Sequence, residues 1–251
     1  MIIKSVFPSW SLLLKEKDRP LNDLARWTEV NTIELGNFFT GATQGALSSG
    51  NEPALFTFPS SEAFNDLTIP TIKQSDFNSI LELLNIIKSK GFNITCNVSP
   101  LYIAHPSLSS LACVDVTGEE VPGIGTNLAF YGCPNNPDTI RYGEAEIREF
   151  ITAWPQADMI SLNHVEFPLW PKKSFRELFV CFCKFCKEKA KKRGINFEEM
   201  RNEITSFYVF LSTPRLENSR QFNELSISGI LNFLIKKPMI TTWLEFRLSS
   251  M

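Results

Sequence analysis

Residues 158–168, DMISLNHVEFP, decide the fold class of this chain. A short apolar run ends there in asparagine, histidine and glutamate, and a proline follows. An apolar run of this length, placed after a helical pattern and a turn, predicts a buried strand of a parallel sheet. In barrels and doubly wound α/β folds, polar groups at the carboxyl end of such a strand line the ligand site. The candidate catalytic residues are therefore Asn163, His164 and Glu166.

The alternation of side chains along a strand limits how these residues can act together. With a period of two, Asn163 faces the opposite side from His164 and Glu166. Asn163 and Glu166 can both reach the mouth of a site only if the strand ends, or bulges, near Val165.

Three further strands with their helices are expected before this segment. The predicted strands span residues 2–8, 31–38 and 92–98, and the predicted helices span residues 21–27, 76–91 and 142–153. Asp76 is expected to cap the second of these helices and Gly91 to end it. Strands that are each followed by a loop and a helix indicate a parallel α/β architecture. From residue 174 the pattern predicts helices alone, at 175–193, 197–208 and 222–249.

The strand count predicts an incomplete barrel. A full (β/α)₈ barrel takes about 250 residues with ordinary loops, whereas the loops predicted here at 40–75 and 101–137 are long. We therefore predict a TIM-barrel-like (β/α) repeat of about half a barrel at residues 1–200. A helical C-terminal tail at 201–251 would lead into a missing second half. A half-barrel exposes two strand edges, which favours a homo-oligomer or pairing with that second half.

Composition excludes several classes of protein. The chain has 251 residues and a net charge of −2, so neither nucleic acid nor an anionic membrane is an expected partner. The N-terminus does not resemble a signal peptide, and no apolar run reaches the ~20 residues that span a bilayer. A cytoplasmic protein is the expectation. No phosphate-binding or dinucleotide-binding glycine motif occurs, so no cofactor is expected.

The strand-borne carboxylates indicate hydrolytic chemistry. Glycoside cleavage needs two carboxyl groups about 5 to 10 Å apart. Glu166 could be the general acid, and Glu34 is the other carboxylate that falls within a predicted strand. A structural ion pair between Glu166 and Arg141 is the alternative, and His164 could be a core residue. The candidate substrate-binding residues lie within a strand, near a strand end, in the long loops or just before a helix: Glu34, Asn97, Tyr102, His105, Asn135 and Arg141.

Three cysteines follow one another in the sequence CFCKFC at residues 181–186. The CxCxxC spacing is known from metal and iron–sulfur ligation, and Cys133 or His164 could supply a fourth ligand. Within a helix Cys183 and Cys186 share a face, but Cys181 does so only if the helix begins after it. No second cysteine pair follows at the spacing of a zinc ribbon, which favours structural thiols or small core residues, with a metal site at Cys181, Cys183 and Cys186 as the alternative.

Three segments together resemble a known group of proteins. They are GCPNNP at 132–137 leading into Arg141-Tyr142, the stretch 158–168, and CFCKFC with the basic residues after it. This pattern resembles uncharacterised glycoside-hydrolase-like TIM-barrel proteins over about residues 92–200. The resemblance implies an acidic residue after the strand leucine, where this chain has Asn163. It also implies that the helix WLEFR at 243–247 leads into a fifth strand.

The residues and the resemblance together imply a glycoside-hydrolase-like protein that acts on or binds carbohydrate. If a partner carboxylate comes from a later strand, this chain alone lacks it and would be inactive. Two alternatives stay open. One is a non-catalytic carbohydrate-binding half-barrel. The other is a metal-dependent barrel, similar to sugar isomerases, that uses His164, Glu166 and Glu34.

Overall fold

A parallel sheet forms one part of the molecule. A computed structural model describes residues 3–6, 12–13, 16, 18–26, 29–38, 74–103, 106–122, 130–163, 165, 167–168, 175–212 and 234–250. The sheet has four strands in the order β1-β2-β3-β6, and every neighbouring pair is parallel. The strands are β1 (Ser5–Val6), β2 (Thr32–Phe38), β3 (Asn93–Val98) and β6 (Met159–Leu162). The prediction of a mixed α/β fold with a parallel sheet is confirmed.

Strand β6 is shorter than the predicted strand 158–166. It ends at Leu162, one residue before Asn163, whose N–H still donates to the carbonyl oxygen of Val98 at 2.8 Å. Val98 is the last residue of β3, and Pro100, two residues further on, has no N–H that could continue the hydrogen bonding of the strand. Strand β6 therefore ends where its neighbour ends.

The two faces of the sheet differ in polarity. On one face Ile33, Leu35, Ile94, Cys96 and Val98 are buried in a core with residues of α2, α3 and α4. On the opposite face, the register pairs Glu34 with Thr95, and Asn97 with Ser161. Side-chain alternation along β2 and β3 thus separates an apolar, helix-covered face from a polar face.

Three helices accompany the sheet: α2 (Asp18–Arg26), α3 (Gln74–Ser89) and α4 (Pro137–Ala153). Helix α3 begins before Asp76, so the predicted cap is wrong, whereas Gly91 with φ of 83° follows its end as expected. Helix α4 begins five residues earlier than predicted. Its N-cap Asn136 accepts a hydrogen bond from the N–H of Asp138, and Pro137 suits the first turn because its missing N–H needs no partner.

The long loop predicted at 101–137 contains secondary structure of its own. Strands β4 (Tyr102–Ile103) and β5 (Phe130–Tyr131) pair antiparallel, and the short helix η2 (Pro106–Leu111) lies between them in sequence. A core separate from that of the sheet forms around Tyr102 and Tyr131 and includes residues from the C-terminal helices.

The predicted helix 175–193 is wrong as a single element. The short helix η3 (Phe175–Leu178) comes first, Val180 then pairs with Asp115 in an isolated bridge, and α5 spans Lys184–Lys192. The bridge holds the chain extended just before the cysteine segment. Helix α6 (Phe197–Ser212) begins at the predicted residue and runs four residues beyond the predicted end. Of the predicted helix 222–249 the structure describes α8 (Pro238–Leu248), and residues 213–233 lie outside the described part.

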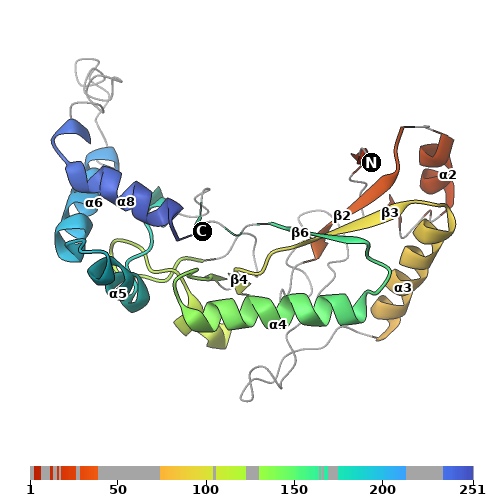
Figure 1. Cartoon of the computed structure of the whole chain (residues 1–251), viewed down its shortest axis with the longest axis horizontal. Coiled ribbons are helices and arrows are strands. Elements are labelled where there is room, and N and C mark those ends of the chain that lie inside the picture. Colours follow the sequence, from red (N-terminus) through yellow and green to blue (C-terminus); the bar gives the residue numbers. More distant parts are fainter. Residues whose placement is uncertain are drawn as a thin grey trace.

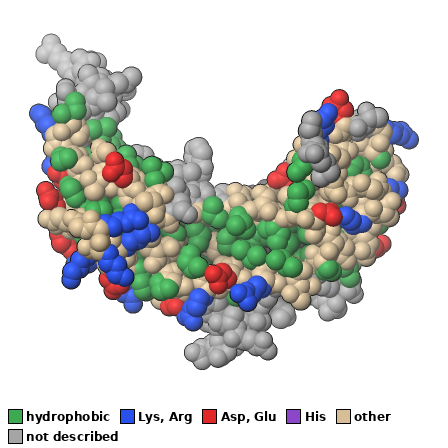
Figure 2. All heavy atoms as spheres, in the orientation of Figure 1, with side chains coloured by type: hydrophobic (Ala, Val, Ile, Leu, Met, Phe, Trp, Pro, Cys, Tyr) green, Lys and Arg blue, Asp and Glu red, His purple; other side chains and the backbone are tan. Residues whose placement is uncertain are grey.

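The elements form an open arch (Figure 1). Helices α2 and α3 lie at one end, α5, α6 and α8 lie at the other, and α4 runs between the two. Figure 2 shows basic side chains gathered over α5 and hydrophobic side chains in the middle of the same face. None of the described helices has the length and apolar character needed to cross a bilayer. The division at residue 200 and a missing second half-barrel stay predictions.

Candidate functional site

Two of the predicted site residues meet on the polar face of the sheet. The side-chain amide of Asn97 donates to Oε1 of Glu34 at 3.1 Å, and the Ser5 hydroxyl lies 3.4 Å from Oε2 of the same carboxylate. Asn97 is buried, and its Oδ1 atom has no hydrogen-bond partner among the described residues. This amide oxygen is therefore a desolvated acceptor beside a fixed carboxylate.

The remaining predicted residues are more scattered. Asn163 follows β6 directly and is exposed. Arg141 lies exposed on α4, where it pairs with Asp138. Tyr102 is buried, and its hydroxyl lies 2.7 Å from that of Tyr131, so its ring is part of the core. The predicted residues His105, His164 and Glu166 lie outside the described residues.

Asn135 belongs to a different site. Its amide nitrogen donates to the sulfur of Cys186 at 3.2 Å, and its oxygen accepts from Lys189 at 2.6 Å. The role of Asn135 in substrate binding stays a prediction, but the structure places the residue beside the cysteine segment.

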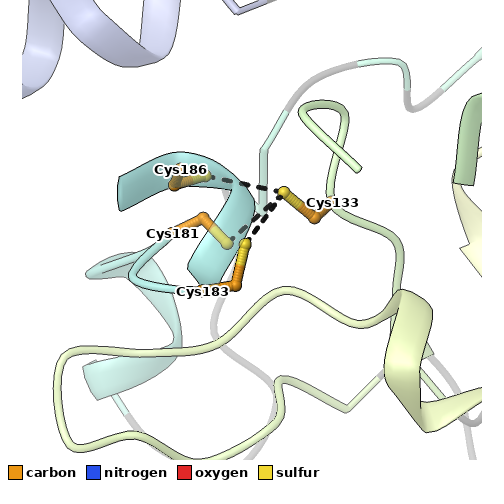
Figure 3. A group of neighbouring side chains, drawn as sticks. All are labelled: Cys133, Cys181, Cys183 and Cys186. Atoms are coloured by element: carbon orange, nitrogen blue, oxygen red, sulfur yellow. Dashed lines mark hydrogen bonds between the residues drawn. The ribbon is translucent and has the colours of Figure 1, made fainter. Parts of the chain in front are cut away.

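Four cysteines come together at that place (Figure 3). The sulfur of Cys133 lies 3.5 Å from that of Cys181 and 3.6 Å from those of Cys183 and Cys186. All four sulfurs lie within 4.8 Å of one another, so together they could hold a metal ion. Cys183 is half-buried and the other three are buried.

Local structure explains why these thiols converge. Cys183 is the N-cap of α5 and Cys186 lies in its first turn, so the helix begins after Cys181 and leaves that residue free to turn inward. The sequence required that the helix begin after Cys181 if that residue was to join Cys183 and Cys186, and the structure meets this requirement. Cys133 reaches the group from the turn that precedes α4, 48 residues before Cys181.

Hydrogen bonds between the thiols shift their pKa values in opposite directions. Hydrogen bonds with Cys113, Cys183 and Cys186 lower the pKa of Cys133 to about 6, although the bond with Cys181 acts in the opposite direction. The pKa of Cys186 is instead raised, chiefly by its hydrogen bond to Cys133. Thiols this close cannot all be anionic without a compensating cation, because like charges disfavour one another's ionisation.

A fifth cysteine, Cys113, lies beside the group. Its thiol donates to the carbonyl oxygen of Gly132 at 3.4 Å and also interacts with Cys133 and Cys181. The sixth, Cys96, is buried in the separate core behind the sheet. The sequence predicted the CxCxxC segment as a candidate site, with Cys133 as a possible fourth ligand. No local pattern in the sequence indicated that Asn135 and Lys189 would lie beside this segment.

Neither of two cavities in the described part of the chain is lined by Glu34 or Asn97. One, of about 190 Å³, has a mainly apolar lining that includes Pro100, Leu101 and Ile140. The other, of about 500 Å³, lies beside Trp154 and the start of β6. Ligand sites of parallel sheets lie at the carboxyl ends of strands, so the position of the second cavity does not favour a catalytic role.

Comparisons with known proteins show distant structural similarity. No family model matches the chain, and no curated protein matches it in sequence. A hypothetical protein from Ruminiclostridium thermocellum ATCC 27405 aligns with 18% identity and a TM-score of 0.41, over 81% of this chain and 90% of that one.

A second similar structure is an enzyme. The GH20 exo-β-N-acetylglucosaminidase from Vibrio harveyi, solved with N-acetylglucosamine, aligns with 12% identity and a TM-score of 0.45 over 78% of this chain. An inactive mutant of that enzyme gives a TM-score of 0.44. The alignment covers 31% of the enzyme, so this chain matches less than a third of its length. Similarities at this level assign no activity to the present chain.

Proposed function

We propose that this chain binds carbohydrate on the polar face of its parallel sheet and belongs to the glycoside-hydrolase-like proteins that its sequence resembles. The observation that carries the proposal is the contact between Glu34 and Asn97. A carboxylate and an amide that are held side by side offer acceptors and a donor to adjacent sugar hydroxyls. The partnerless Oδ1 atom of Asn97 favours a ligand that donates a hydrogen bond.

Hydrolysis is the finer part of the proposal. Glu166 would protonate the leaving oxygen, and Glu34 would be the second carboxylate, as nucleophile or as base for water. Asn163 follows the end of β6, where a substrate bound across the carboxyl ends of β3 and β6 would contact it. A half-barrel that binds sugar without cleaving it is the second candidate, because the described contacts of Glu34 are with Asn97 and Ser5, neither of which is a second carboxylate.

Binding and cleavage are tested separately. Saturation-transfer NMR against a panel of monosaccharides and oligosaccharides should detect sugar binding by the wild type. Asn97→Ala should weaken this binding at least 10-fold, because the truncation removes both the amide donor and the Oδ1 acceptor of the side chain. Glu82→Gln is the matched control, since Glu82 is exposed on α3, which packs on the other face. Binding that is absent, or equally strong in Asn97→Ala, would refute the site.

Turnover is measured on an aryl-glycoside panel with the wild type, Glu166→Gln and Glu34→Gln. Loss of cleavage in both glutamine variants, with folding retained, supports the hydrolase. Sugar binding without any turnover supports the binding protein. Turnover that is unchanged in both variants rejects the catalytic assignment.

A further inference from the structure

Four cysteine sulfurs from two distant segments face a common point in the core of the helical end (Figure 3). Three belong to the turn and first helical residues around 181–186, and one belongs to the turn before α4. This core also contains Phe179, Phe197 and Trp243, so the thiols lie among aromatic side chains rather than in solvent. The carbohydrate proposal does not use this group.

We propose that Cys133, Cys181, Cys183 and Cys186 bind one zinc ion in a tetrahedral, structural site. Zinc binds thiolates at about 2.3 Å, which sets the edge of the sulfur tetrahedron at about 3.8 Å. The three sulfur–sulfur distances from Cys133 are 3.5, 3.6 and 3.6 Å, and no pair exceeds 4.8 Å. Side chains already at these distances need little rearrangement to enclose the ion.

The same distances argue against the other chemistries of clustered cysteines. A disulfide joins two sulfurs at about 2.05 Å, whereas Cys133 lies almost equally far from three partners. An iron–sulfur cluster places its ligands on separate irons and would hold the four sulfurs farther apart than a single ion does. A tetrahedral set of four sulfurs around one centre is typical of zinc.

The surroundings offset the negative charge of a tetrathiolate centre. The N–H of Val114 donates to Cys181 at 3.4 Å, and the amide of Asn135 donates to Cys186. The first turn of α5, which carries Cys186, adds the positive end of the helix dipole. Hydrogen bonds to metal-bound sulfur orient the ligands and stabilise their charge.

Two cations lie near the sulfurs. The half-buried Arg247 places its guanidinium over the rings of Phe167 and Trp243, where it interacts electrostatically with Cys113 and Cys181. Lys189 interacts in the same way with Cys133 and Cys186. Four thiolates and one zinc ion leave a net charge of about −2, which these two side chains offset.

Four protein ligands fill the tetrahedron, so the ion would have no position for water or substrate. Its role is then to fasten the turn that leads into α4 to the start of α5. These segments are about 50 residues apart, and no disulfide joins them.

The 251-residue chain tests the proposal directly. Elemental analysis of protein purified without chelator should find one zinc per chain. Exchange of the zinc for cobalt(II) should give the intense visible absorption of a tetrahedral thiolate site. Cys186→Ser and Cys133→Ser should lose the zinc, whereas Cys96→Ser and Cys113→Ser should retain it. The cobalt spectrum of the wild type does not depend on whether any variant folds.

Asn135→Ala provides a finer test, because loss of a residue that orients a ligand weakens zinc affinity about 10- to 100-fold. Each contrary result overturns a stated part of the proposal. Chains without metal, or iron in place of zinc, would refute the zinc site. A cobalt spectrum without thiolate character would refute the ligand set, as would loss of zinc in Cys96→Ser.

Discussion

Asp158 connects three elements at the start of β6, and replacing it with alanine should measurably destabilise the sheet. The ammonium group of Lys88, in the last turn of α3, donates to both carboxylate oxygens at 2.7 and 2.8 Å. The N–H of Ile94 in β3 donates to Oδ2 at 2.7 Å. One carboxylate thus contacts the end of α3 and the start of the neighbouring strand β3.

The size of the effect follows from these contacts and their exposure. The side chain of Asp158 is 35% exposed and that of Lys88 is 37% exposed, so their ion pair is worth at most about 1 kcal/mol. The hydrogen bond from Ile94 to a charged oxygen would contribute about 1.5 to 3 kcal/mol if buried, and we take about 1 kcal/mol at this exposure. The total of about 2 kcal/mol corresponds to a Tm lower by about 4 to 8 °C.

The destabilisation should depend on pH in a defined direction. Burial alone would raise the pKa of Asp158, but the hydrogen bonds from Lys88 and Ile94 lower it below its usual value. A group whose pKa is lower in the folded state stabilises the fold above its unfolded pKa of about 3.9. That stabilisation is lost as the pH falls through the folded pKa. The gap between wild type and Asp158→Ala should therefore be full near pH 7 and close at lower pH.

Urea denaturation curves of the wild type, Asp158→Ala and Lys88→Met, recorded at several pH values, measure the loss of unfolding free energy and its dependence on pH. Lys88→Met removes only the ion pair and should cost less than about 1 kcal/mol. Equal midpoints for Lys88→Met and Asp158→Ala would refute the assigned role of the Ile94 hydrogen bond. A gap between wild type and Asp158→Ala that persists unchanged below about pH 3 would refute the charge-dependent part.

Two further predictions concern close contacts between segments. Gly143→Ala should destabilise the protein, because the added Cβ would lie 2.9 Å from both Cβ and the carbonyl oxygen of Pro100. This close contact should outweigh the preference of about 1 kcal/mol that alanine has over glycine in a helix. A Tm equal to or above that of the wild type would contradict the prediction. Trp243→Phe should cost about 1 to 3 kcal/mol in urea denaturation, because the buried carbonyl oxygen of Val180 loses the indole N–H that donates to it at 2.9 Å. An unchanged midpoint would show that this carbonyl finds another donor.

Local pattern was enough to predict the sheet. The apolar residues Ile33 and Leu35 in β2, and Ile94 and Cys96 in β3, alternate with polar ones, and the structure buries the apolar set. Such alternation is encoded within six or seven residues, so it is visible without any knowledge of the partner strand. The length of β6 was not predictable in this way, because it depends on where β3 ends.

The cysteine group shows the limit of the same reasoning. The spacing CxCxxC is local, but the approach of Cys133 depends on the path of 48 intervening residues. The start of α5 was equally hidden, because the bridge between Val180 and Asp115 sets where the extended segment ends. Tyr102 was predicted to contact sugar, yet it is buried against Tyr131, a pairing that the predicted loop did not contain.

Helix α4 relates the cysteine group to the sheet. Asn136 caps the helix three residues after Cys133, while Phe150 and Trp154 at its far end pack in the core of the sheet. Seventeen residues span about 25 Å along the helix axis, and in the first half of α4 Gly143 lies close to Pro100, two residues beyond the end of β3. A zinc ion enclosed by four thiolates has no open position, so it could not polarise a substrate even if one came near. An ion there would therefore support the fold, whereas the carbohydrate proposal rests on Glu34 and Asn97.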